Sequence, residues 1–472
     1  MPGRHQPAHA PLSPRDVVGS GLCIGCGSCV AQVTQDVQGG APGPRMELDR
    51  FGQLQPRGPA SWYRRASSRL ARTCPFSPSA RDEDELAADL FPAAPQRHPA
   101  VGRYRAAYVG YVAEGEFRGQ GSSGGMVSWV LAELLRRGLV DGAVHVVASD
   151  DPQGEGRFFR YRVSRTEEEI LEGAKSRYYP VELSQVLRTI RSVPGRYALV
   201  GVPCFIKAVQ LLRREDAVLR QRVAFTLGLF CGHMKSARFV ESFAWQMGVP
   251  VAEVQQVEFR LKDPGRPAST YTAQLTLRDG RVVRRDWWNL VDGDWGAGFF
   301  QYAACNFCDD VVAETADISF GDAWVEPYAS DGRGTNVVLT RSPVLEELVA
   351  AGRREGRLQL DPVDGPFVEQ TQAAGFRQRR EGLAYRLCWP RTGIRPRKRV
   401  APQARTVALR RKLIYHMRAV ISAWSHRVFW LAHLTRRPQI YLRWARAAVA
   451  VYHGLAYSRG KLGELIERLH LR

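Results

Sequence analysis

The sequence predicts an α/β (α+β) core between a cysteine-rich N-terminal module and a basic helical C-terminal extension. Three observations predict this arrangement: strands alternate with helices in the middle of the chain, cysteines crowd its first part, and arginines crowd its last part. With 472 residues the chain is too long for one compact core, so two or three domains are expected. Hydrophobic residues make up 44% and charged residues 24%, which is ordinary for a globular protein with a large core.

The segments before the core are expected to be poorly structured on their own. Residues 1–20 are rich in Pro, His and Ala and are predicted to be disordered. Residues 21–80 combine cysteines with scattered Gly and Pro and have little periodicity, so a metal centre would be needed to order them. Residues 81–103 are first acidic and then Pro-rich, and they are predicted to form a linker.

The core is predicted over residues 104–395, where apolar runs alternate with helical patterns. The expected strands are 106–112, 143–148, 197–201 and 223–230. A helix is expected over 126–137, and a hairpin over 271–285 with Asp279-Gly280 at its turn. Pro-rich sequence near residues 390–402 marks the end of the core.

Charge and cysteine usage limit the function classes. The net charge of +20 favours polyanionic partners but does not choose among nucleic acid, anionic lipid and acidic protein. Nine cysteines, an odd number, argue against a pure disulfide framework. The N-terminus has no secretory signal pattern, and no apolar run is long enough to span a bilayer. These features predict a reducing, cytoplasmic location, where metal binding or catalysis is the more common use of cysteine.

The first cysteine group predicts an iron–sulfur cluster. Cys23, Cys26 and Cys29 form a C-x2-C-x2-C run, and Cys74-Pro75 follows about 45 residues later. Three thiolates at this spacing can wrap a short loop around one face of a cubane, and the intervening glycines permit the backbone angles required. The alternative is a structural zinc site, which usually has two separated C-x2-C pairs. The pattern therefore favours a ferredoxin-like [4Fe–4S] module.

Four further cysteines could form a second site. Cys204 and Cys231 each follow a predicted strand, at the edge where open α/β sheets gather ligands, and Cys305 and Cys308 form a C-x2-C pair. Taken alone, a cysteine after a strand is more often a buried small hydrophobe, and the pair could bind zinc or act as a redox dithiol. Cys388 remains, and we interpret it as a packing residue or an unliganded thiol.

Several motifs, in order, resemble those of the family of coenzyme F420 hydrogenase/dehydrogenase beta subunits, which includes chlorophyll-pathway reductases. The motifs are Ser122-Ser123-Gly124-Gly125, Gly201-Val202-Pro203-Cys204, Phe230-Cys231-Gly232-His233, Cys305-Asn306-Phe307-Cys308 and the run from Ala316 to Trp324. The resemblance spans roughly residues 20–345 and implies that Cys204, Cys231, Cys305 and Cys308 jointly hold a [4Fe–4S] cluster beside FAD. It also implies a second cluster in the N-terminal module. The fold class is thus an α/β (α+β) core with an N-terminal ferredoxin-like iron–sulfur module and a C-terminal basic helical extension.

The Gly/Ser loop at 119–125 is the candidate flavin site. Glycines let the backbone approach a ligand, and hydroxyls with free N–H groups at a helix start suit phosphate or a flavin edge, although a plain flexible turn is the alternative. Many family members carry Gly-Ser-Lys-Tyr where this chain has Ala174-Lys175-Ser176-Arg177-Tyr178, so an arginine would replace the usual lysine. The expected cofactor-binding residues are Ser122, Ser123, Gly124, Gly125, Ser176, Tyr178, Asp322 and Asn336.

The predicted function is an iron–sulfur flavoprotein oxidoreductase that passes electrons between an external carrier, expected to be ferredoxin, and an organic substrate or F420. A flavin can take up single electrons and deliver a pair. Lys175 and Arg177 would stabilise negative charge, and His233 would either supply a proton or form a hydrogen bond near the cluster. A non-enzymatic electron-transfer subunit is the main alternative. A nucleic-acid-binding protein is disfavoured, because no RRM, KH or helix-turn-helix signature is present.

Residues 403–472 are predicted to form a basic amphipathic helical tail. The apolar stripe comprises Leu413, Met417, Val420, Ile421, Trp424, Val428 and Leu431. Such a helix could lie on an anionic membrane surface, making the protein peripheral on the inner membrane face. Alternatively, it could pack on the body of the protein or on a partner subunit.

Overall fold

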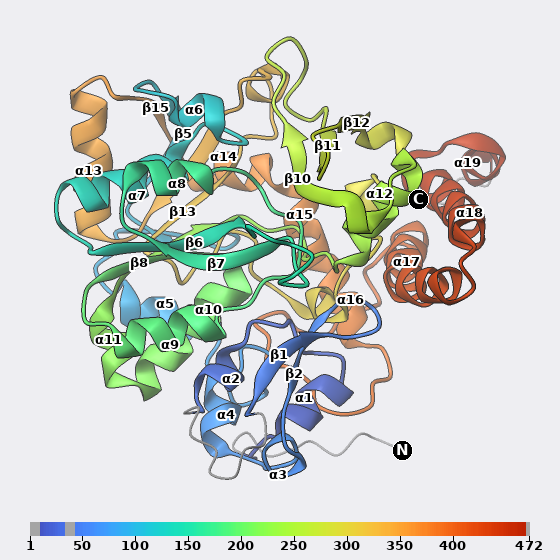
Figure 1. The fold of residues 1–472 in the computed structure, drawn as a ribbon, viewed down its shortest axis with the longest axis horizontal. Coiled ribbons are helices and arrows are strands. Elements are labelled where there is room, and N and C mark those ends of the chain that lie inside the picture. Colours follow the sequence, from blue (N-terminus) through green and yellow to red (C-terminus); the bar gives the residue numbers. More distant parts are fainter. Residues whose placement is uncertain (1–9, 34–42, 469–472) are drawn as a thin grey trace.

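A computed structural model describes residues 10–33 and 43–468, and its centre is a mixed eight-stranded sheet (Figure 1). The strand order is β15–β5–β14–β13–β9–β8–β6–β7. The strands are β5 (Ala106–Val112), β6 (Gly142–Ala148), β7 (Phe159–Ser164), β8 (Tyr197–Gly201), β9 (Val223–Leu229), β13 (Ile318–Asp322), β14 (Asn336–Thr340) and β15 (Leu358–Val363). Strands β6, β8, β9 and β13 are parallel, and β7 and β14 flank them antiparallel. The predicted α/β core is confirmed.

The central strands are buried on both faces, which explains their nearly continuous apolar sequence. Every residue of β8 and of β14 is buried. The strands expected at 106–112 and 197–201 have those bounds, and the other expected strands differ by one residue. Apolar runs bounded by Gly or polar residues therefore located the core strands correctly.

Helices cover both faces of this sheet. One apolar core joins the sheet to α7 (Met126–Arg136) and α13 (Pro343–Arg354), and another joins it to α9 (Ser184–Ser192), α10 (Pro203–Glu215) and α11 (Ala217–Arg222). Shorter helices connect these layers: α6 (Phe117–Gln120), α8 (Glu167–Glu172), α14 (Gly365–Thr371), α15 (Ala373–Arg379) and α16 (Glu381–Leu387).

A second layer combines a three-stranded antiparallel sheet with the C-terminal helices. The sheet contains β10 (Val254–Leu261), β11 (Thr272–Leu277) and β12 (Val282–Asp286). The helices that share its apolar core are α12 (Arg238–Met247), α17 (Leu409–Leu434), α18 (Pro438–Tyr457) and α19 (Gly460–Arg468). Figure 1 shows α17 and α18 side by side, next to the part of the chain that contains α12.

The C-terminal helices therefore pack on the body of the protein, and the stripe expected from the sequence takes part only through Met417, Ile421 and Val428. Ile421 of that stripe is buried, whereas Leu413, Trp424 and Leu431 are exposed. The buried face of α17 instead contains Ile414, Tyr415, Ser425, Phe429 and Ala432. No helix among the described residues is both long and apolar enough to cross a membrane.

The N-terminal part forms a small unit of short elements. These are α1 (Pro14–Gly19), α2 (Ser28–Ala31), α3 (Ala60–Tyr63), α4 (Ser68–Thr73), β1 (Arg45–Leu48) and β2 (Leu54–Arg57), with β1 and β2 paired antiparallel. Residues 1–9 and 34–42 lie outside the described residues. Leu22, Ile24 and Phe76 of this unit join the apolar core that contains α10.

Two expectations about the flanking segments are wrong. Residues 10–20, predicted to be disordered, contain α1, because Ser13 and Asp16 form a capping box and Leu12 and Val17 are buried. The predicted linker 81–103 contains α5 (Glu83–Leu90) and a hairpin of β3 (Gln96–His98) and β4 (Gly102–Tyr104). Its acidic stretch is the capped first turn of α5, where carboxylates interact favourably with the helix dipole.

Candidate functional site

A large cavity lies at the carboxyl ends of the parallel strands β8, β9 and β13. Its volume is about 1050 Å³, at the upper end of the range for small-molecule and cofactor sites. Predicted site residues that line it are Ser122, Ser123, Gly125, Lys175, Ser176, Arg177, Tyr178, Cys231, His233, Cys305, Asp322 and Asn336. Gly124 lies behind this wall, where a Cβ atom would meet the main chain of Gly110 and Asn336.

The Gly/Ser loop is fixed at the start of α7 by side chains from distant segments. The Ser176 N–H donates to Ser122 Oγ at 2.8 Å, and Ser123 Oγ donates to the Thr335 carbonyl at 2.9 Å. Asn336 accepts from the Met126 N–H at 3.2 Å and donates to the Gly321 carbonyl at 3.0 Å. Asn336 therefore holds the loop in place, and it joins the loop to β13.

Asp322, at the end of β13, is paired with a cation that the sequence did not indicate. Arg260 Nη1 lies 2.9 Å from Asp322 Oδ2, and the Arg260 guanidinium lies 4.4 Å from the ring centroid of Tyr271. Lys262, two residues further, donates to the Ser123 carbonyl at 2.8 Å. Burial, together with neighbouring Lys175, lowers the pKa of Lys262 to about 7. In the sequence, the only sign of this arrangement was that two cations, Arg260 and Lys262, stand at the end of a strand whose later residues alternate between apolar and polar.

Lys175 and Arg177 both reach the cavity, and both are partly desolvated. Burial lowers the pKa of Lys175, while Glu258 opposes this effect, and burial lowers the pKa of Arg177 to about 10. The Arg177 guanidinium lies 5.0 Å from the ring centroid of Phe159, and its Nε has no hydrogen-bond partner in the described residues. Buried cations of this kind can stabilise negative charge on a bound molecule.

An aromatic wall faces the cysteine side of the cavity. The His233 imidazole stacks on the Trp295 indole with centroids 4.1 Å apart, and Trp295 also contacts Tyr178. His233 is buried, and its Nε2 has no hydrogen-bond partner within residues 10–33 and 43–468. Burial lowers the pKa of His233 well below its usual value, so the neutral imidazole is favoured.

The structure brings Cys204, Cys231, Cys305 and Cys308 together. Burial raises the pKa of the Cys204 thiol, and the other three cysteines raise it further, as expected for neighbouring thiols. Cys204 lies in the first turn of α10, Cys231 follows β9, and Cys305 and Cys308 belong to the short turn at Ala303–Phe307 and its end. The Met234 N–H donates to Cys305 Sγ at 3.3 Å.

Arg379 is a functional candidate that sequence reasoning missed. Its side chain is buried beside the four thiols and donates to the main-chain carbonyls of Cys305 and Cys231 at 2.8 and 3.2 Å. The neighbouring Cys308, Cys231 and Cys305 oppose the lowering of its pKa by burial, and the net shift is upward. No motif or spacing in the sequence links Arg379 to the cysteines, so its position could not be predicted.

Cys23, Cys26, Cys29 and Cys74 form the other group. Burial raises the pKa of Cys29, and Cys23, Cys26 and Cys74 raise it further. Gly25 and Gly27 have φ values of 76° and 78°, as the predicted wrapping loop requires. Members of both groups belong to one apolar core or pack against it, and Cys26 is near enough to Cys204 to raise its pKa, so the two groups are neighbours.

All nine cysteines lie in the described part of the chain and are free thiols, and Cys388 is the exposed one. Within residues 10–33 and 43–468, no three His, Cys, Asp or Glu side chains are spaced to hold a single metal ion. A [4Fe–4S] cluster separates its thiolate ligands more widely than one ion does, because four irons and four sulfides lie between them. Two groups of four thiols, each of them buried or half-buried, suit such a cluster.

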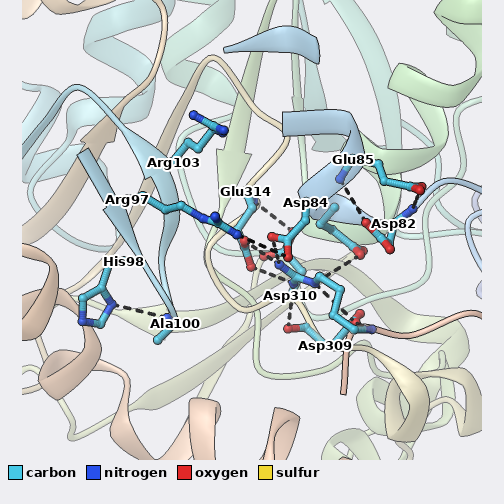
Figure 2. Close-up of polar contacts among 12 residues, drawn as sticks. Asp82, Asp84, Glu85, Arg97, His98, Ala100, Arg103, Asp309, Asp310 and Glu314 are labelled. Atoms are coloured by element: carbon cyan, nitrogen blue, oxygen red, sulfur yellow. Dashed lines mark hydrogen bonds and ion pairs between the residues drawn. The ribbon is translucent and has the colours of Figure 1, made fainter. Parts of the chain in front are cut away.

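A buried network of charges fixes the segment after Cys308. Lys398 Nζ lies 2.9 Å from Asp309 Oδ1, and Arg399 Nη1 lies 2.7 Å from Glu314 Oε2 and 3.1 Å from Asp84 Oδ1. Figure 2 shows Asp84, Asp309, Asp310 and Glu314 converging on this centre. The network therefore connects α5 and the segment before α17 to the chain that follows Cys308.

Comparison with known proteins gives the class. A family model described as coenzyme F420 hydrogenase/dehydrogenase, beta subunit N-term, matches residues 107–188, and the corresponding C-terminus model matches residues 195–365. Together these matches cover more than half of the chain. The chain belongs to the family of coenzyme F420 hydrogenase/dehydrogenase beta subunits, as the motifs predicted.

Individual relatives are more distant. The chain is 25% identical over 248 residues to a subunit of the F(420)H(2) dehydrogenase of Methanosarcina mazei, covering 51% of this chain and 62% of that protein. It is 20% identical over 363 residues to coenzyme F420-dependent sulfite reductase of Methanocaldococcus jannaschii, covering 74% and 49%. The chain thus spans less than two thirds of the length of these relatives. A chain of the F420-reducing [NiFe] hydrogenase complex of Methanosarcina barkeri aligns with a TM-score of 0.46 and 20% identity, covering 60% of this chain and 91% of that chain.

Proposed function

We propose that this protein is an iron–sulfur flavoprotein oxidoreductase that exchanges electrons between an external carrier, two [4Fe–4S] clusters and FAD, and that acts on an organic substrate or F420. The observation that carries the proposal is the adjacency of two four-thiol groups, one of which borders the cavity through Cys231 and Cys305. Family membership supports the oxidoreductase class. The names of the two curated relatives support F420 as the electron donor or acceptor.

The chain's own residues would divide the work as follows. The eight cysteines would hold the two clusters. Arg379 would offset negative charge at the cluster held by Cys204, Cys231, Cys305 and Cys308, called here the inner cluster. The Gly/Ser loop, with α7 behind it, would hold the flavin, and the Arg260–Asp322 pair would shape the same end of the cavity. A flavin, when bound, supplies the conversion between single electrons and electron pairs.

Cations around the cavity would then favour an anionic reduced state. Lys175 and Arg177 lie in the cavity wall, where low polarity strengthens their interaction with negative charge. His233, stacked on Trp295, would orient a bound ring or hydrogen-bond to it through its free Nε2. The aromatic wall would exclude water from the reacting atoms.

A non-enzymatic electron-transfer subunit is the second candidate. It is favoured by the match to a protein named as a component of a dehydrogenase, of which this chain covers 62%. Ferredoxin as the carrier, an anionic membrane surface as a docking site and a cytoplasmic location are parts of the same proposal. Activity of the isolated chain with F420 would support an enzyme, and activity that requires an added partner would support the subunit.

The direct experiment is anaerobic purification of the full chain followed by assays of iron, sulfide and flavin. Two clusters and one flavin predict about eight irons, about eight sulfides and one FAD per chain. The protein should be brown and should bleach when reduced. Colourless protein that contains zinc and no flavin would contradict the proposal.

A further inference from the structure

Helices outside the matched family region complete one end of the cavity. The family models end at residue 365, yet Arg386 of α16, Arg418 of α17, and Tyr452 and Tyr457 of α18 line the cavity wall. They meet the short turn Trp295–Ala297, where the Gly296 carbonyl accepts a hydrogen bond from Arg418 Nη1. This end of the cavity is therefore built by helices that follow the matched region in the sequence.

Arg386 is buried and Arg418 is half-buried, and neither pairs with a carboxylate in the described part of the chain. Arg386 is 4% exposed and donates from Nε to the Asn306 carbonyl and from Nη2 to the Gln378 carbonyl, both at 2.8 Å. Neither Arg386 nor Arg418 forms an ion pair within residues 10–33 and 43–468. Carbonyl oxygens satisfy N–H groups but leave the positive charge uncompensated, which is costly in a buried site.

Other cations make the same region more positive. Arg379 and Lys235 lie close enough to share the site, and Lys235 Nζ donates to the Phe299 carbonyl at 2.7 Å. Burial, with Arg418 and Arg379 adding to it, lowers the pKa of Arg386 to about 9. One acid, Asp294, also lines this end: it hydrogen-bonds His453 at 2.7 Å, and its charge opposes the lowering of the pKa of Arg418 by burial, so it offsets part of the positive charge there. The thiols beside Arg379 would offset the charge of Arg379, and Asp294 offsets part of the charge of Arg418, so Arg386 carries most of the remaining positive charge.

This cationic end is separate from the cations near the Gly/Ser loop. Besides burial, Lys175 and Arg260 lower the pKa of Lys262, whereas Arg418 and Arg379 lower the pKa of Arg386. The aromatic residues Tyr178, Trp295 and His233 lie between the two sets. The phosphates of a flavin held at the Gly/Ser loop would lie near Lys175, Arg260 and Lys262, not near Arg386 and Arg418.

We propose that Arg386 and Arg418 form a subsite for a carboxylate or phosphate group of the organic substrate, with the Tyr452 and Tyr457 hydroxyls beside it. Guanidinium groups suit both anions, because their planar N–H donors match the spacing of two oxygens. The subsite rests on the proposed function only in that it binds the substrate of that reaction. Its alternative occupant is the pyrophosphate of the flavin.

The test uses the flavin-loaded full chain and two probes, inorganic phosphate and succinate. Binding would be followed through tryptophan fluorescence, since Trp295 precedes the Gly296 carbonyl that Arg418 contacts. The variants are R386Q, R418Q and the double variant, with R386K and R418K to retain charge. R427Q is the matched control, because Arg427 lies exposed on the same helix over Trp424.

We expect saturable binding of at least one probe, weakened about tenfold or more by each Gln variant and unchanged in R427Q. The Lys variants should lose less affinity for the probe than the Gln variants. Added salt should weaken binding of the probe to the wild type. No saturable binding to the wild type, or equal binding to folded R386Q and R418Q, would overturn the subsite. Loss of FAD from these variants, with a normal FAD content in R427Q, would assign the site to the flavin and overturn the substrate assignment. Absence of iron or flavin from wild-type protein would instead count against the proposed function, since phosphate binding requires neither.

Discussion

Arg379 donates a hydrogen bond from Nη1 to the main-chain carbonyl of Cys305 at 2.8 Å, and the same guanidinium reaches the carbonyl of Cys231 at 3.2 Å. One side chain from α15 therefore joins the segment after β9 to the turn that carries the C-x2-C pair. Its charge also faces the four thiols of the inner cluster. Arg379 therefore both positions the segments that carry these thiols and offsets their negative charge.

Replacing Arg379 by Met is expected to remove the inner cluster and leave the N-terminal one. The two carbonyls would lose their donor in a buried site, at a cost of about 3 kcal/mol, and negative charge would lose its counter-charge. Iron per chain should fall to about half of the wild-type value. R379K should retain more iron because it keeps the charge, and R377Q, at an exposed position in the same helix, serves as the control. Unchanged iron and an unchanged reduced EPR spectrum in R379M would contradict this role.

A second prediction separates the liganding cysteines from the remaining one. Cys204 is grouped with three other thiols at the start of α10, whereas Cys388 is exposed. C204S should lose about half of the iron and the ability to pass electrons to the flavin, while C388S should retain both. The measurements are iron content and the rate of flavin reduction by dithionite-reduced ferredoxin. Equal iron loss in the two variants would remove Cys204 from the ligand set.

The Arg260–Asp322 pair is expected to be required for flavin retention. Arg260 is 7% exposed, so R260M would leave a largely buried carboxylate without its partner and should destabilise the protein by about 3–5 kcal/mol. The double variant R260M/D322N should recover much of that stability, because no unpaired charge remains. Thermal unfolding and FAD content would be measured for both single variants and the double variant. Additive effects of the two substitutions would show that the pair does not act as a unit.

Local patterns predicted the core strands, because apolar runs are short-range signals, and they singled out the cysteines that remain the proposed ligands. The apolar runs of β8 and β9 and the cysteine that follows each of them could be found without knowing the fold. The partners Arg260 and Arg379 could not, since an ion pair or a contact with a carbonyl depends on tertiary packing and leaves no fixed spacing. The packing of the tail was left open for a related reason: α17 has apolar residues on more than one face, and periodicity alone does not say which of them pack.

His145 should make stability depend on pH in a defined direction. It lies in β6, is 6% exposed, and its Nε2 is 2.8 Å from Ser164 Oγ. Burial, with Arg162 adding to it, lowers its pKa to about 4. The unfolded chain therefore binds a proton between about pH 6.5 and pH 4 that the folded chain does not, so stability should fall as the pH falls through this window.

At pH 5 this histidine alone should cost about 2 kcal/mol relative to neutral pH. H145Q can keep the hydrogen bond to Ser164 but cannot take up the proton. Its free energy of unfolding should therefore fall less than that of the wild type between pH 7.5 and pH 5, which denaturant titration at each pH would measure. His433 is exposed on α17, so H433Q provides the control and should follow the wild type. Parallel pH curves for H145Q and the wild type would mean that His145 is protonated in the folded protein, and the desolvation argument would then fail at the wall of the cavity that it lines.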